Sequence, residues 1–304
     1  MKPYNGNLLQ KIKEFKLERN AIILAHNYQR EEIQQVADFV GDSLELSRKA
    51  ADSDAEVIVF CGVRFMAEVA AILAPEKTVL LPDHHAGCSL AAMVSVADLR
   101  QKKKEHPRAA VVAYVNSPAA VKAECDICVT SSNAVAVVNS LAAEEIIFVP
   151  DKNLGSYVAK QTGKKVILWD GYCATHHCVT GEDVANARRA DPRALVMVHP
   201  ECRPEVVAAA DYSLSTGQMF KLARETENET IIVGTETGVL PRLRQENPEK
   251  NFLPLSPKMV CPDMKLVTLI KLLLALVKMR TPVEVPAEIS RPARRALERM
   301  LAVV

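Results

Sequence analysis

Short, wholly apolar runs alternate along the chain with stretches in which apolar residues recur every three or four positions. Residues 21–25, 110–115 and 195–198 are apolar at almost every position, which is typical of strands buried on both faces of a parallel sheet. The stretches between such runs have the spacing of amphipathic helices. This alternation predicts an α/β fold whose short parallel sheets are covered by helices on both faces.

The pattern predicts the following elements. The expected strands are residues 21–25, 57–60, 79–81, 110–115, 127–130, 146–149, 166–168, 195–198, 212–214, 231–233 and 252–255. The expected helices are residues 7–19, 31–39, 44–51, 66–73, 118–124, 134–141, 154–162, 263–279 and 286–301.

One set of chemically similar residues occurs three times. Three apolar runs end at a polar residue, spaced 88 and 85 residues apart: His26, Tyr114 and His199. Seventeen residues after each comes a small hydroxyl residue: Ser43, Ser131 and Thr216. A cysteine follows a later apolar run in each copy: Cys88, Cys173 and Cys261. A unit of about 85 residues is therefore repeated three times.

The repeat predicts three similar small α/β domains around a pseudo-threefold axis, because the period is too long and the copies too few for a solenoid. The expected domains are residues 1–87 with the terminal helices of 265–304, residues 88–172 and residues 173–264. In parallel sheets, ligands bind at the carboxyl ends of the strands. The polar residues lie at these ends, so we expect one central site shared by all three domains.

Cys88, Cys173 and Cys261 predict a metal centre, since thiolates are soft ligands for zinc or iron–sulfur clusters. A closed structural zinc site requires four ligands, often in close pairs. Three widely separated cysteines suit one [4Fe–4S] cluster per chain, with one iron left open for substrate. The other cysteines are not predicted as ligands: Cys61, Cys125, Cys128, Cys178 and Cys202.

Ser43, Ser131 and Thr216 each precede an expected helix. Ordinary N-capping explains any one of them. Three in register would direct three helix N-termini at one centre, which predicts a site for phosphate or carboxylate groups. The chain has no glycine-rich nucleotide loop after a strand, so we expect a small anionic ligand.

The polar residues at the strand ends belong to triplets that supply acid–base groups. These triplets are His26-Asn27-Tyr28, Tyr114-Val115-Asn116 and His199-Pro200-Glu201. The remaining histidines near the cysteines occur in only one copy each and are expected to be loop or supporting residues: His84, His85, His176 and His177.

Composition narrows the class of protein. Among 304 residues, 38 are basic and 37 acidic, so no excess charge indicates nucleic acid or an anionic membrane as partner. The beginning of the chain lacks the pattern of a secretory signal. The longest apolar stretch, residues 266–277, contains Lys271 and is too short to span a membrane. We therefore expect a cytoplasmic protein.

Eight strings of the sequence resemble the iron–sulfur quinolinate synthase family and follow the family order over nearly the whole chain. They are AIILAHNYQ at 21–29, ADFVGDSLELSRKA at 37–50, AYVNS at 113–117, VTSSNAV at 129–135, PDKNLG at 150–155, VHPEC at 198–202, STGQM at 215–219 and VCPDMK at 260–265. The strings around Cys88 and Cys173 match less closely. The resemblance implies three α/β domains around a pseudo-threefold axis.

The resemblance also implies a transferase of NAD biosynthesis, which condenses iminosuccinate (iminoaspartate) with dihydroxyacetone phosphate to quinolinate, phosphate and water. The implied ligands of a [4Fe–4S] cluster are Cys88, Cys173 and Cys261. The implied catalytic residues are Tyr28, Glu201, His26 and His199. The implied substrate contacts are His26, Ser43, Tyr114, Val115, Asn116, Ser131, His199, Pro200, Glu201 and Thr216.

Some relatives carry a CxxCxxC string near the last ligand, but Cys261 is the only cysteine after Cys202, so no such redox switch is expected. The imine substrate would arrive free in solution or from an aspartate-oxidising partner enzyme. Three other functions stay open: a different open-iron hydro-lyase, a non-enzymatic iron–sulfur sensor and a zinc-stabilised sugar-phosphate binding protein. The sensor is disfavoured, since the sequence contains no basic recognition helix.

Overall fold

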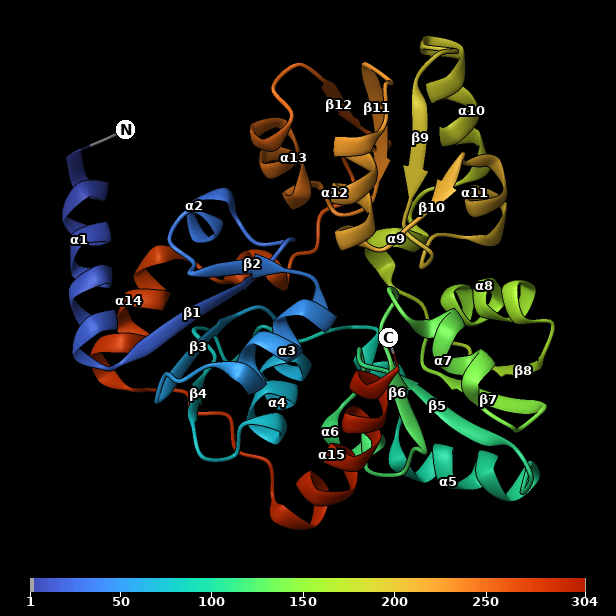
Figure 1. Cartoon of the computed structure of the whole chain (residues 1–304), viewed down its shortest axis with the longest axis horizontal. Helices are drawn as coiled ribbons and strands as arrows, with labels where there is room; N and C mark the ends of the chain where they lie inside the picture. The colour runs from blue at the N-terminus through green and yellow to red at the C-terminus, as the bar shows by residue number, and fades with distance from the viewer. Residues whose placement is uncertain (1–2, 304) are drawn as a thin grey trace.

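The computed structural model describes residues 3–303 and contains three separate sheets (Figure 1). Each sheet has four strands, all parallel, and the same order, in which the first strand of the unit lies between the second and the third. Figure 1 shows the three units as lobes around a common centre. The predicted α/β class with three similar units is confirmed.

The first sheet consists of β1 (Ala21–His26), β2 (Phe39–Gly41), β3 (Val57–Cys61) and β4 (Thr78–Leu80). Its connecting helices are α2 (Glu31–Gln34), α3 (Ser43–Asp52) and α4 (Arg64–Leu73). Helices α1 (Pro3–Glu18) and α14 (Leu269–Lys278) pack against each other beside this sheet, although they come from opposite ends of the chain (Figure 1).

The second sheet consists of β5 (Ala110–Tyr114), β6 (Ile127–Val129), β7 (Glu145–Val149) and β8 (Lys165–Leu168). Its helices are η1 (Ala91–Met93), α5 (Val96–Glu105), α6 (Ala119–Lys122), α7 (Ala134–Ser140) and α8 (Lys152–Thr162). The last helix, α15 (Ala287–Ala302), packs on α6, β6 and α4 and so joins the second unit to the first. The exact domain boundaries stay a prediction.

The third sheet consists of β9 (Leu195–Val198), β10 (Tyr212–Ser213), β11 (Thr230–Gly234) and β12 (Asn251–Pro254). Around it lie α9 (Ala174–His177), α10 (Gly181–Ala190), α11 (Pro204–Ala209), α12 (Thr216–Glu225), η2 (Thr237–Val239) and α13 (Leu240–Glu246). The chain then returns to the first unit through η3 (Met264–Leu266).

One contact shows that the three units repeat at the level of single atoms. An aspartate precedes the second strand of each unit, and its Oδ2 atom accepts a hydrogen bond from a backbone N–H of the first strand. The pairs are Asp38 with Ile23, Asp126 with Val111 and Asp211 with Val196, at 2.8, 2.7 and 2.7 Å. These aspartates are 88 and 85 residues apart, which is the spacing of His26, Tyr114 and His199.

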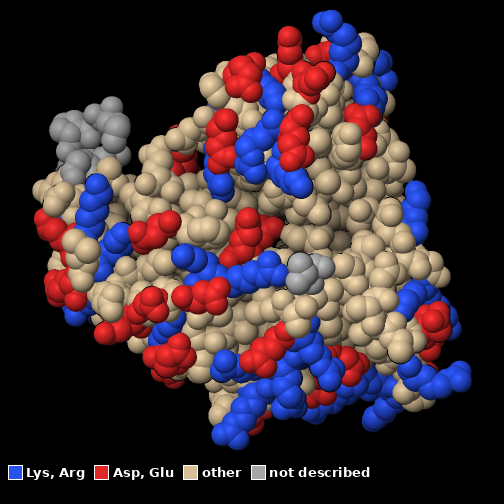
Figure 2. All heavy atoms as spheres, viewed as in Figure 1, with Lys and Arg blue, Asp and Glu red and all other residues tan. Residues whose placement is uncertain are grey.

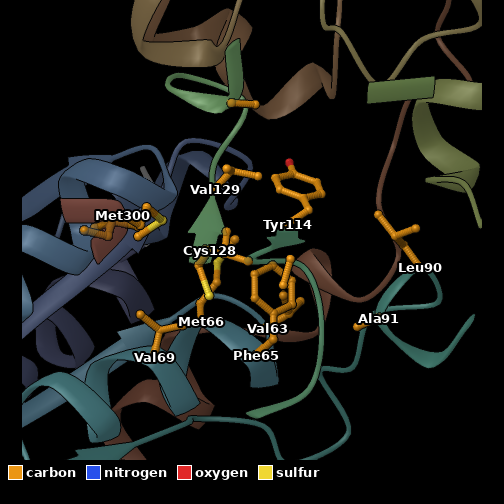
Figure 3. Packing of buried hydrophobic residues seen from close by; sticks show 14 of the residues in the cluster. Val63, Phe65, Met66, Val69, Leu90, Ala91, Tyr114, Cys128, Val129 and Met300 are labelled. Atoms are coloured by element: carbon orange, nitrogen blue, oxygen red, sulfur yellow. The ribbon is translucent and has the colours of Figure 1, made fainter. Parts of the chain in front are cut away.

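The apolar strands bury their side chains in a core that runs through all three units. The largest cluster of buried residues contains Phe60 of the first sheet, Phe148 of the second and Phe252 of the third. Figure 3 shows part of it, where Val63 and Phe65 lie below the ring of Tyr114, whose hydroxyl points away from them. The core therefore holds the strand ends of different units in fixed positions.

Two predicted helices were wrong. Residues 31–39 were expected to be one helix, but α2 ends at Gln34 and residues 39–41 form β2. The carboxylate of Asp38 binds the first strand and so fixes an extended chain after it. Residues 263–279 divide into η3 and α14, because Thr268 is extended and its hydroxyl caps the N-terminus of α14.

Figure 2 shows basic and acidic side chains mixed over the upper part of this face, while basic side chains gather along its lower edge. Among residues 3–303, no helix combines the length and the apolar character needed to cross a membrane.

Candidate active site

The carboxyl ends of the strands from all three sheets surround one cavity of about 330 Å³. All three triplets contribute to its wall, as do the three cysteines and the three hydroxyl residues. The predicted residues that line it are His26, Tyr28, Ser43, Cys88, Tyr114, Asn116, Ser131, Cys173, His199, Glu201, Thr216 and Cys261. Val115 and Pro200 are absent from this wall and are buried behind it.

The three cysteines lie in the loops that enter the cavity, and all are free thiols. Burial raises the pKa of Cys88 to about 12, and negative charge on Glu201 and Cys261 acts in the same direction. Burial also raises the pKa of Cys173, again with contributions from Glu201 and Cys88. Ionised thiols would therefore repel one another here, and a positively charged metal group would remove that penalty.

The donor atoms can be compared with the needs of a metal. Around one tetrahedral zinc ion, sulfur ligands would lie about 3.8 Å apart, since each Zn–S bond is about 2.3 Å. Among residues 3–303, the group of three possible ligand atoms that all lie within 4.8 Å of one another comes from Cys173, His176 and Glu201, and the three thiols do not form such a group. The three thiols thus line one cavity without surrounding a single ion. This arrangement fits a larger group that contains several metal atoms.

The three hydroxyl residues are not N-caps. The side chains that cap α3 and α12 are those of Asp42 and Ser215, so Ser43 and Thr216 are the first residues inside their helices. Ser131 precedes Asn133, the residue before α7. Because none of the three hydroxyl groups caps its helix, they can contact a ligand. The Oγ atom of Ser131 lies 3.1 Å from Nε2 of His199.

Glu201 forms the centre of a buried acid–base cluster. Its Oε2 atom lies 3.1 Å from Nδ1 of His176 and 3.1 Å from Nδ1 of His199. Burial acts to raise the pKa of this carboxyl group, but the two imidazoles hold it below its ordinary value. Glu201 is therefore an ionised acceptor.

Two buried oxygens in the wall have no hydrogen-bond partner within residues 3–303. They are Oε1 of Glu201 and Oδ1 of Asn116. Buried polar atoms are almost always paired in folded proteins. These two atoms therefore mark the places where a bound molecule would supply hydrogen-bond donors.

Tyr28 and His26 lie side by side, with ring centroids 4.5 Å apart. The Tyr28 hydroxyl is 2.7 Å from Oγ1 of Thr235. Burial and the charge of Glu201 raise the pKa of Tyr28, so its hydroxyl keeps the proton. Burial and the neighbouring His199 lower the pKa of His26 to about 3. Since Nδ1 of this neutral ring accepts from the backbone N–H of Tyr28, its Nε2 carries the proton.

His176 and Asp42 are the important wall residues that the sequence did not assign to the site. The ring of His176 is 1% exposed and stacks on His199 at 4.6 Å. Its position one turn after Cys173 was the available signal. Asp42 belongs to the first unit, and its Oδ2 accepts from Oγ of Ser132 in the second unit at 2.7 Å. Its spacing in the repeat gave no reason to expect this contact.

Three like α/β units that place thiols, imidazoles and a buried carboxylate around one cavity define an enzyme with a shared central active site. The chain matches the family model described as Quinolinate synthetase A protein over residues 10–302. It is 58% identical over 300 residues to the quinolinate synthase of Dehalococcoides mccartyi strain 195, covering 99% of both chains. It is 54% identical over 294 residues to that of Geobacter metallireducens, covering 97% of both chains.

A quinolinate synthase of Methanosarcina barkeri is 53% identical over 298 residues, again with 98% of both chains covered. The chain therefore belongs to the quinolinate synthase family.

Proposed function

We propose that the protein condenses iminosuccinate with dihydroxyacetone phosphate and closes the pyridine ring of quinolinate, with loss of phosphate and water. The observation that carries this proposal is the central cavity, where helix N-termini, neutral donors and a buried carboxylate from three units surround one space. Such a set can hold two anionic reactants together and move protons between them. In the cell, the product would serve the synthesis of NAD.

The candidate ligands of a [4Fe–4S] cluster are Cys88, Cys173 and Cys261. Support comes from the donor set, since each unit supplies one soft thiol and the three do not enclose a single ion. When bound, the cluster would supply Lewis acidity through the iron that has no protein ligand.

The anionic groups of the substrates would be held by neutral donors. No lysine or arginine belongs to the described wall of the cavity, so a carboxylate or phosphate meets no positive side chain there. Ser43 and Thr216 stand at the N-termini of α3 and α12, where the helix dipole favours negative charge. Ser131 and the Nε2–H of His26 add two further donors.

Proton transfer would centre on Glu201 and Tyr28. Glu201 lines the cavity and is an ionised acceptor whose Oε1 atom has no hydrogen-bond partner within residues 3–303, so its carboxylate is suited to remove a proton from the condensing carbon or nitrogen. Tyr28 holds its proton and is suited to donate it to a leaving hydroxyl. His199 would orient both Glu201 and Ser131 through its two ring nitrogens.

The test is an anaerobic assay of purified protein with iminosuccinate and dihydroxyacetone phosphate. Formation of quinolinate by brown protein with about four irons and four sulfides per chain would support the proposal. Dehydration of a hydroxy acid without any need for the triose phosphate would favour a different hydro-lyase. Colourless protein with stoichiometric zinc and no quinolinate would refute the proposal.

A further inference from the structure

Each cysteine loop is attached to its own unit by the same backbone hydrogen bond. The residue that begins the segment after the third strand donates its N–H to the carbonyl two positions before the cysteine. The donor and acceptor pairs are Arg64 with Ala86, Lys152 with Gly171 and Thr237 with Met259, at 2.8, 2.8 and 2.9 Å. This attachment is therefore a conserved part of the threefold repeat within the chain.

In two of the units, an acidic side chain adds a second bond to the loop. The residue before the backbone donor is Asp151 in the second unit and Glu236 in the third. Oδ2 of Asp151 accepts from the backbone N–H of Cys173 at 3.1 Å. Oε1 of Glu236 accepts from the backbone N–H of Cys261, also at 3.1 Å. Both acids are 0% exposed.

Other bonds fix the two acids themselves. The Oδ1 atom of Asp151 accepts from the backbone N–H of Leu154 and thereby caps α8. The Oε2 atom of Glu236 accepts from the backbone N–H of Gly238 at 2.7 Å, and Oε1 lies 3.0 Å from Nζ of Lys265. A rigid acceptor of this kind limits the movement of the cysteine backbone that it binds.

The first unit lacks the acid. Val63 occupies the equivalent position after β3, and its side chain cannot accept a hydrogen bond. Within residues 3–303, the backbone N–H of Cys88 therefore has no acidic acceptor, although its loop keeps the shared bond between Arg64 and Ala86.

We propose that Asp151 and Glu236 are positioning residues, which fix the thiols of Cys173 and Cys261 for the cluster by binding their backbone N–H groups. This inference rests on the proposed function, because it requires these cysteines to be cluster ligands. Groups that orient the ligands of a metal typically change its affinity about 10- to 100-fold when they are removed. A second consequence is that the backbone N–H groups of Cys173 and Cys261 do not donate a hydrogen bond to the sulfur of the same residue.

The experiment compares Asp151→Ala and Glu236→Ala with wild-type protein, all purified anaerobically. The readouts are iron and labile sulfide per chain, visible absorbance and the rate of iron loss to a chelator such as EDTA. We expect each variant to lose iron about 10- to 100-fold faster than wild type. Matched controls are Asp170→Ala, whose acid lies in the Cys173 loop with a 93% exposed side chain, and the exposed Glu249→Ala.

Asp151→Asn and Glu236→Gln keep the size of each side chain but retain a single oxygen acceptor. If circular dichroism of the apoprotein shows that an alanine variant does not fold, these two variants are used in its place. In folded protein we expect them also to lose iron faster than wild type. If all folded variants have the iron content and iron release rate of wild-type protein, the positioning role of Asp151 and Glu236 is refuted, but the proposed function is not. Wild-type protein without an iron–sulfur cluster would overturn the proposed function and the inference with it.

Discussion

Replacing Glu201 by glutamine tests the acid–base centre with little change in shape. Oε2 of the carboxylate lies 3.1 Å from Nδ1 of both histidines, and Oε1 has no hydrogen-bond partner within residues 3–303. The side-chain oxygen of a glutamine can keep the position of Oε2 beside the two imidazoles. Its NH₂ group would then replace the unpartnered Oε1, so a donor would stand where the wild type has an acceptor.

The structure allows the two effects of this change to be separated. A hydrogen bond to a charged acceptor contributes about 1.5–3 kcal/mol, against about 0.5–1.5 kcal/mol for a neutral one. Weaker contacts with the two imidazoles would lower the free energy of unfolding by roughly 2 kcal/mol, part of which is offset because no charge remains buried. Loss of the proton acceptor should lower kcat by about 10²- to 10⁴-fold.

The assay measures quinolinate formation under anaerobic conditions, together with iron and sulfide content and thermal unfolding. We expect normal cluster content, a small decrease in melting temperature and a kcat reduced by at least about 100-fold. The matched control is Glu205→Gln, an exposed glutamate four residues further along, which should behave as wild type. A wild-type kcat in Glu201→Gln would remove Glu201 from the proposed chemistry.

Three further predictions follow from contacts away from Glu201. Arg242 donates from Nη1 to Oδ1 of Asn27 at 3.0 Å, and Nδ2 of Asn27 donates to Oγ1 of Thr216 at 3.1 Å. Arg242→Lys should therefore raise KM about 10-fold with little change in kcat, whereas the control Arg224→Lys should not. An unchanged KM in Arg242→Lys would refute this. The pKa of His26 is about 3 in the folded state and about 6.5 in the unfolded chain, so the unfolded state binds more protons below pH 6.5. The free energy of unfolding of the apoprotein should therefore fall by about 1.4 kcal/mol per pH unit on acidification below 6.5. Urea unfolding of His26→Asn should show a smaller decrease. Phe60 is 2% exposed in the shared core, so Phe60→Ala should lower the free energy of unfolding by about 3–5 kcal/mol, and a loss below about 1 kcal/mol would mean that the core collapses around the site.

The sequence predicted the architecture because the repeat is visible in single residues. Parallel strands buried on both faces produce unbroken apolar runs, and three runs with equal spacing identify three equivalent units. The strand β2 escaped detection, since it has only three residues and the apolar positions before it fit a helix. Comparison of Asp38 with Asp126 and Asp211 would have identified it, because those two aspartates precede predicted strands.

The sequence also located most of the cavity wall, for a geometric reason. Residues at the carboxyl ends of parallel strands meet at one edge of a sheet, so the ends of three sheets lie together at the centre. In two triplets the chain turns directly after the strand, because the carbonyls of His26 and His199 accept hydrogen bonds from the N–H groups of Gln29 and Cys202. The middle residues of all three triplets, Asn27, Val115 and Pro200, do not line the cavity, whereas the residues on both sides of each do.

The residues that sequence patterns could not assign act through contacts between units or between loops. His176 on α9 reaches Glu201 only because the loop that carries it returns to the strand ends of the third sheet, and Asp42 meets Ser132 across the junction of two units. Asp151 and Glu236 bind the backbone of cysteines 22 and 25 residues further along the chain. Such contacts depend on the path of each loop, for which a single sequence contains no periodic signal.

The comparison of equivalent positions explains how a symmetric scaffold can serve an asymmetric reaction. The backbone attachment of the three cysteine loops is the same, and the three thiols are the same, as a compact inorganic cluster would require. The neighbouring positions differ: His26 and His199 correspond to Tyr114, and Val63 corresponds to Asp151 and Glu236. The two substrates of the proposed reaction are unlike and would bind in one orientation, so their contacts would differ from unit to unit. The repeat therefore places backbone positions equivalently around the cavity, and the different side chains at those positions determine the orientation in which substrates can bind.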